Sequence, residues 1–178
     1  MNENYSNLQN NKKIFWISSY PKSGNTWLRL LLCGLFFTNE GKINNFDILE
    51  KIPGHDSLNN FEYLKNINLH DYNIIFNNSD YDESTILTYS KYWIESQKKT
   101  KIKNGSFGFF KTHNARVNIN NNYYTDSSTT MGFIYIYRDP RDVSVSYSKH
   151  MNKDIIEVVN FLLDGKIIEK EKINNKMP

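Results

Sequence analysis

The sequence predicts an α/β fold built around a central parallel sheet. Three short apolar segments each end in a polar turn, and two of these turns lead into helical segments; the segments are Ile14–Ser18, Phe107–His113 and Gly132–Arg138. Strands that alternate with helices along the chain are typical of parallel sheets. Such sheets bind their ligands at the carboxyl ends of the strands. Lys22, His113 and Arg138 follow or close these strands, so we expect a ligand site there.

The first strand leads through a Pro- and Gly-containing turn into a helix expected over Thr26–Phe37. This helix is apolar on nearly all sides, so we expect it to be largely buried. Residues 39–105 are polar with short apolar islands, which predicts loops and short helices, including one over Ile86–Trp93. In an enzyme, loops of this kind are where we would expect a substrate to bind.

After the last strand, Pro140 is placed to begin a helix that continues to Met151. A further helix is expected over Ile155–Leu163, ended by Gly165. We divide the chain into a flexible polar arm (1–12), one domain (13–165) and a charged tail (166–178).

Composition excludes some classes of protein. The 178 residues suit one domain, and 39% hydrophobic residues can form a core. A net charge of +3 is too small to indicate a nucleic-acid partner. The apolar stretch Leu28–Phe37 is too short to span a bilayer, and residues 1–13 resemble no targeting peptide, so we expect a cytoplasmic protein without a membrane partner. The single cysteine, Cys33, lies in an apolar run and is expected to be a buried core thiol.

The turn over Tyr20–Trp27 has the chemistry of an anion site. Amides at a helix N-terminus point at the ligand, and the helix dipole favours negative charge. Lys22 adds a full charge, and Gly24 lets the backbone approach closely. The residues alone leave an ordinary capped turn with an exposed lysine as an equal alternative.

The string Tyr–Pro–Lys–Ser–Gly–Asn–Thr–Trp over Tyr20–Trp27 resembles the 5′-phosphosulfate loop of the sulfotransferase family. The resemblance implies that Lys22 contacts the bridging oxygen of the donor, 3′-phosphoadenylyl sulfate (PAPS), and that Trp27 stacks on its adenine. It also implies that four residues surround and bind the 5′-phosphate, namely Ser23, Gly24, Asn25 and Thr26.

A second string begins at Arg138 and reaches Ser146 on the following helix. An arginine offers a planar fork of donors that suits a phosphate. By itself this pattern also fits a surface Arg–Asp network that caps a helix. It resembles the 3′-phosphate motif of the same family, which implies that Arg138 and Ser146 bind the 3′-phosphate of the nucleotide.

Lys111–Thr112–His113 closes the second predicted strand and lies between the two motifs, where the family places its catalytic histidine. A lone histidine is more often structural, but histidine titrates nearest to working pH and suits a general base. The resemblance implies that His113 takes the acceptor proton, Lys22 stabilises the leaving oxygen and Lys111 holds the sulfonate. His55, His70 and His150 match no motif and are expected on the surface or behind the site.

The resemblance implies a P-loop-NTPase-like three-layer fold and sulfuryl transfer from PAPS to a hydroxyl or amine of a small molecule or glycan, with no metal. Lys22 precedes Gly24, the reverse of the order in an ordinary P-loop, which argues against a kinase acting on ATP. The resemblance covers roughly residues 13–150, and the family's C-terminal Gly–Asp–Trp-like segment has no counterpart here. We therefore expect a domain incomplete at its C-terminal side, with an inactive nucleotide-binding module as the alternative. Neither the acceptor nor the oligomeric state is readable from the sequence.

Overall fold

A three-stranded parallel sheet forms the centre of the molecule in the computed structural model, which describes residues 13–55, 57–77, 82–102 and 106–163. The strands are β1 (Ile14–Ser19), β2 (Gly108–Thr112) and β5 (Thr130–Ile136), in the order β2-β1-β5. Ser18 of β1 pairs with Thr112 of β2 and with Tyr135 of β5. All three carboxyl ends therefore meet at one edge, as the sequence predicts.

One face of the sheet is covered by α2 (Asn25–Phe37) and the short helix η1 (Phe46–Lys51). Their core contains Ile17, Cys33 and Ile52, each fully buried. Burial raises the pKa of the Cys33 thiol, and its Sγ lies 3.3 Å from the carbonyl oxygen of Ile48. Cys33 is thus the core thiol that the sequence predicts.

The expected burial of α2 is wrong for one of its faces. Trp27, Leu31 and Leu35 follow one another at four-residue spacing and are 75%, 68% and 71% exposed. Side chains four residues apart share one side of a helix. Only the opposite side of α2, which carries Leu28 and Leu32, packs against the core.

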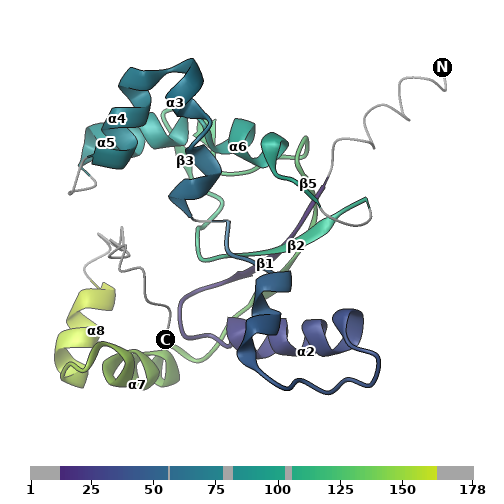
Figure 1. Cartoon of the computed structure of the whole chain (residues 1–178). Coiled ribbons are helices and arrows are strands. Elements are labelled where there is room, and N and C mark those ends of the chain that lie inside the picture. The colour runs from purple at the N-terminus through teal and green to yellow at the C-terminus, as the bar shows by residue number, and fades with distance from the viewer. Residues whose placement is uncertain (1–12, 56, 78–81, 103–105, 164–178) are drawn as a thin grey trace.

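The other face of the sheet is covered by the segment between η1 and β2, which folds mainly as short helices (Figure 1). These are η2 (Leu58–Phe61), α3 (Leu64–Ile67), α4 (Leu69–Asn77), α5 (Glu83–Ser90) and α6 (Trp93–Lys99). The expected helix over 86–93 is instead two helices, since α5 ends at Ser90 and α6 starts at Trp93. Their apolar side chains form a second core with Ile14 and Trp16 of β1.

A small hairpin between β2 and β5 has no counterpart among the sequence predictions. It consists of β3 (Asn118–Ile119) and β4 (Asn122–Tyr123), paired antiparallel. The two turn residues, Asn120 and Asn121, have φ values of 49° and 66°. Two-residue hairpin turns favour asparagine at such left-handed positions.

Two helices follow β5, namely α7 (Pro140–Met151) and α8 (Ile155–Leu163). The carboxylate of Asp139 caps α7 by accepting from the Arg141 amide at 2.9 Å. Figure 1 shows both helices beyond the carboxyl ends of the strands. The expected stop at Gly165, the arm and the tail lie outside the described residues.

Helices thus lie on both faces of a parallel sheet, which confirms the predicted α/β fold class. Within the ranges that the structure describes, no helix has the length and apolar character needed to cross a membrane.

Candidate functional site

A cavity of about 810 Å³ opens at the carboxyl edge of the sheet. It is lined by residues of the turn after β1, α2, the end of β2, the end of β5, α7 and α8. Of the ten site residues predicted from sequence, nine line it: Lys22, Gly24, Asn25, Thr26, Trp27, Lys111, His113, Arg138 and Ser146. The tenth, Ser23, is buried within the same turn. The structure therefore brings together three segments that are distant in sequence.

The turn before α2 presents an uncapped helix start to this cavity. Gly24, the residue before the helix, has a φ of 107°, and no side chain caps the helix. Lys22 has a φ of 64°, a left-handed conformation that is costly for a residue with a Cβ. Such strain gathers at functional sites, where the surrounding structure enforces it. The first amides of α2 are left available for a ligand.

Ser23 supplies an independent sign of a ligand. Its side chain is only 6% exposed, and its Oγ has no hydrogen-bond partner among the described residues. A buried hydroxyl without a partner is unfavourable and calls for an explanation. A phosphate oxygen at the start of α2 would satisfy it, so the turn fits an anion.

Arg138 connects the end of β5 to the same turn. Its Nη1 lies 3.4 Å from the carbonyl oxygen of Lys22, and its Nε lies 3.7 Å from a carboxylate oxygen of Asp142. Ser146, two turns along α7, lines the cavity on the same side. Arg141, by contrast, is engaged by Asp139 and is absent from the lining.

His113 follows β2 and is held against the end of β1. Its Nδ1 lies 2.8 Å from the carbonyl oxygen of Ser19. Ser18 of β1 pairs with Thr112 of β2. The residues that follow them, Ser19 and His113, therefore lie side by side at the edge of the sheet. Lys111, two residues before His113, also reaches the cavity.

The cavity has a strongly basic lining. It contains four lysine or arginine side chains and two histidines, and the lining found in the described ranges includes no acidic residue; the cations are Lys22, Arg29, Lys111 and Arg138. Like charges lining a cleft raise the local concentration of an oppositely charged ligand. The cavity is suited to a ligand with several negative charges.

Arg29 belongs to this site although the sequence interpretation did not single it out. Its Nη2 donates to the carbonyl oxygen of Leu49 at 2.8 Å, while its buried Nε has no partner among the residues described. Burial lowers the pKa of this guanidinium. Its position one turn after Asn25 on α2 is the signal that could have pointed to it.

The far wall of the cavity comes from α7 and α8 and was also missed. Its members are Tyr147, His150, Met151 and Phe161. His150 was expected on the surface or behind the site; it is exposed, and it also lines the cavity one turn after Ser146. Four-residue spacing from a predicted site residue is the signal that could have found it.

The two other histidines lie away from the cavity. His70 is exposed on α4, as expected. His55 is only 4% exposed, its Nε2 lies 2.9 Å from Thr100 Oγ1, and its ring contacts Trp16 and Phe110. Of the two places expected for His55, the surface is wrong. The residue is buried behind the site, and its backbone amide donates to the carbonyl oxygen of Lys111 at 3.0 Å.

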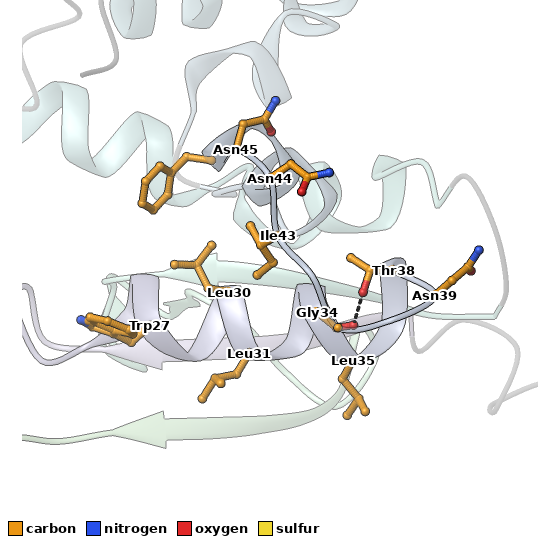
Figure 2. Close-up of a pocket in the computed structure, with 12 residues that line it drawn as sticks. Trp27, Leu30, Leu31, Gly34, Leu35, Thr38, Asn39, Ile43, Asn44 and Asn45 are labelled. Carbon is orange, nitrogen blue, oxygen red and sulfur yellow. Dashed lines mark hydrogen bonds between the residues drawn. The ribbon is translucent and has the colours of Figure 1, made fainter.

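A second hollow of about 720 Å³ lies beside α2 and shares only Trp27 with the basic cavity. Figure 2 shows Leu30 and Ile43 facing each other across it, with Trp27 at one end. Within the described residues, its lining contains apolar, amide and hydroxyl side chains and no charged group. It lacks the lysine and arginine side chains of the first cavity.

In the ranges that the structure describes, no cluster of three or more His, Cys, Asp or Glu side chains is placed to hold a metal ion. A basic cavity around an uncapped helix start, at the carboxyl edge of a parallel sheet, is the kind of site that suits a phosphorylated anion in an α/β protein. The chain matches the family model described as sulfotransferase domain over residues 12–168, and it belongs to this family. Searches of curated proteins and of solved structures returned no match.

Proposed function

We propose that this protein transfers a sulfuryl group from PAPS to a hydroxyl or amine of a small molecule or glycan. The observation that carries the proposal is the convergence of Lys22, His113 and Arg138 on one basic cavity. Membership of the sulfotransferase family supports sulfuryl transfer in general. The identity of the donor and the role of each residue belong to the proposal.

In this proposal the 5′-phosphate lies at the start of α2. The Ser23 hydroxyl donates to it, together with the backbone amides of Gly24, Asn25 and Thr26. Asn25 contributes through its backbone, because its side-chain amide donates to the Ile17 carbonyl oxygen at 3.1 Å and to Ser19 Oγ at 3.2 Å. Trp27, whose ring is exposed, stacks on the adenine.

In this proposal Arg138 and Ser146, which both line the cavity, bind the 3′-phosphate. Arginine is suited to this task because its fork of donors matches two phosphate oxygens at once. A nucleotide without the 3′-phosphate would leave these donors unpaired, which is how the site discriminates against ATP.

The transfer step needs a base and a stabilised leaving group. The acceptor oxygen or nitrogen forms a bond to sulfur while the bond from sulfur to the bridging oxygen breaks. The acceptor proton passes to Nε2 of His113, and the electron pair of the broken bond stays on the nucleotide 5′-phosphate, where Lys22 stabilises it. Lys111 holds the sulfonate oxygens, so catalysis combines positioning with electrostatic stabilisation.

A nucleotide-binding module without transfer activity is the second candidate, and one observation favours it. Trp27 is 75% exposed and Tyr137, beside Arg138, is 84% exposed, so the adenine side of the cavity is open to solvent. Water in a site weakens the electrostatic interactions that stabilise the transition state.

Transfer of radiolabelled sulfate from PAPS to a panel of phenols, alcohols, amines and glycans tests the proposal. The wild-type protein should label at least one acceptor. Lys22→Ala and His113→Ala should each lower kcat by about 10²-fold or more. Lys51→Ala, at the exposed end of η1, is the matched lysine control. Equal transfer by wild type and His113→Ala would remove His113 from the role of base.

A further inference from the structure

A chain of hydrogen bonds connects the anion-binding turn to His113 through the last residue of β1. The Nδ2 of Asn25 donates to Ser19 Oγ at 3.2 Å. Ser19 in turn faces the ring of His113, with its carbonyl oxygen 2.8 Å and its Oγ 3.3 Å from Nδ1. Asn25 and Ser19 are 6% and 2% exposed, so solvent scarcely competes for these bonds.

The carbonyl oxygen of Ser19 fixes where the proton of neutral His113 lies. A carbonyl oxygen only accepts hydrogen bonds, so Nδ1 must carry the proton that spans the 2.8 Å contact. A neutral imidazole has one proton, which leaves Nε2 as the nitrogen with a free electron pair. Nε2 is the atom that must accept a proton from a substrate in the proposed reaction.

Asn25 fixes the position of Ser19. Its two amide protons go to two acceptors of the same strand, the Ile17 carbonyl oxygen at 3.1 Å and Ser19 Oγ. Its Oδ1 is buried and has no hydrogen-bond partner in the described part of the chain. A buried side-chain amide with an unsatisfied oxygen is unfavourable for stability, so its presence here calls for another explanation.

We propose that Ser19 and Asn25 are positioning residues that hold His113 in the tautomer with the proton on Nδ1. Asn25 is the first residue of α2 and its backbone lies in the anion-binding turn, so one residue connects the donor site to the base. This inference rests on the proposed function for its role in transfer. The tautomer itself is a property of the protein that needs no donor.

The test combines NMR of the histidine rings with kinetics on the full chain. Long-range nitrogen–proton spectra of labelled protein, at a pH where His113 is neutral, report which ring nitrogen carries the proton. The variants are Ser19→Ala, Asn25→Ala and Ser19→Thr, which restores the hydroxyl. Asn60→Ala is the matched control, because Asn60 Nδ2 donates to the carbonyl oxygen of His55 at 3.0 Å, away from His113.

We expect wild-type His113 to carry its proton on Nδ1. Both alanine variants keep the Ser19 carbonyl oxygen but lose the bond by which Asn25 holds Ser19 in place, so a part of their His113 should carry the proton on Nε2 instead. Loss of one hydrogen bond should lower kcat about tenfold in each alanine variant. In Ser19→Ala, which alters no residue proposed to contact the nucleotide, affinity for adenosine 3′,5′-bisphosphate should stay within about twofold of the wild-type value. Ser19→Thr should restore both readouts, and Asn60→Ala should leave the His113 signals unchanged.

Three results would overturn the inference. One is a wild-type His113 with its proton on Nε2. Another is an unchanged tautomer in both alanine variants, each of them folded. The third is loss of bisphosphate binding in Asn25→Ala without a change in tautomer, which would make Asn25 a direct ligand of the phosphate. Absence of transfer by the wild-type protein would count against the proposed function alone, because the tautomer is measured independently.

Discussion

Arg138 allows a sharp test of how the cavity distinguishes nucleotides. Replacing it by alanine removes the guanidinium proposed to bind the 3′-phosphate while leaving the start of α2 in place. A hydrogen bond to a charged group is worth about 1.5–3 kcal/mol. The Arg138 side chain is 42% exposed, so the lower end of that range applies. We therefore expect about tenfold weaker binding of adenosine 3′,5′-bisphosphate.

Isothermal titration calorimetry with two ligands separates the loss of the 3′-phosphate contact from a general disruption of the cavity. Adenosine 5′-phosphate lacks the 3′-phosphate, so Arg138→Ala should change its affinity by less than about twofold. Arg141→Ala is the matched control, because Arg141 is also an exposed arginine at the start of α7 but is held by Asp139, with Nη2 and Oδ2 2.6 Å apart. It should leave both affinities near the wild-type values. Equal losses for the two ligands in Arg138→Ala would refute the assignment of the 3′-phosphate to this residue.

Three further predictions concern the scaffold that holds the cavity. Gly24→Ala should lower the free energy of unfolding, measured with denaturant, by about 1–2 kcal/mol, because a Cβ there meets no atom within 4 Å but must adopt a left-handed backbone conformation. Gly54→Ala is the control, since Gly54 does not have a left-handed φ, and it should lower the free energy of unfolding clearly less. Equal losses in the two variants would contradict this reasoning. Leu31→Ala should change the free energy of unfolding by less than about 0.5 kcal/mol, because Leu31 is exposed. Leu64→Ala should lower it by about 2–5 kcal/mol, because Leu64 is fully buried. A larger loss in Leu31→Ala than in Leu64→Ala would show that another surface covers the outer side of α2. Burial raises the pKa of the Cys33 thiol and shields it from reagents. Iodoacetamide should therefore label Cys33 only when denaturant unfolds the protein. Rapid labelling of the native protein would disprove the place of Cys33 in the core.

The residues proposed to bind the anion could be placed from the sequence because their chemistry is local. Lys22 and Gly24 lie in one turn between a strand and a helix, and that short string determines both the backbone path and the donors. Arg138 is likewise placed by the strand that ends before it. Their convergence follows from strands that are parallel and in register, so that three carboxyl ends meet.

Contacts made across the fold are not readable in this way. The burial of His55 depends on packing against Trp16, which is distant in sequence. Phe161 reaches the cavity only because α8 folds back on α7. The exposed side of α2 shows a further limit, since an apolar residue such as Leu31 signals burial whether or not another element covers it.

The short helices between α2 and β2 agree with the expected loops and short helices, but most of their positions could not be read from the sequence, for a different reason. Their sequence is polar, but side chains cap several of them. The carboxylate of Asp82 accepts from the Thr85 amide at 2.8 Å at the start of α5. The Asn45 side chain accepts from the Asp47 amide in η1. Such caps favour helix starts in segments whose hydrophobic pattern is weak.

Thermal unfolding with and without nucleotide tests the central claim most directly, because it requires no knowledge of the acceptor. At a hundred times its dissociation constant, a ligand that binds only the folded state stabilises it by about 2.7 kcal/mol. For a domain of this size that raises Tm by roughly 5–10 °C. We predict this rise with adenosine 3′,5′-bisphosphate and little or none with ATP at the same concentration. No rise with the bisphosphate, or an equal rise with ATP, would contradict the assignment of the cavity to a 3′-phosphorylated nucleotide.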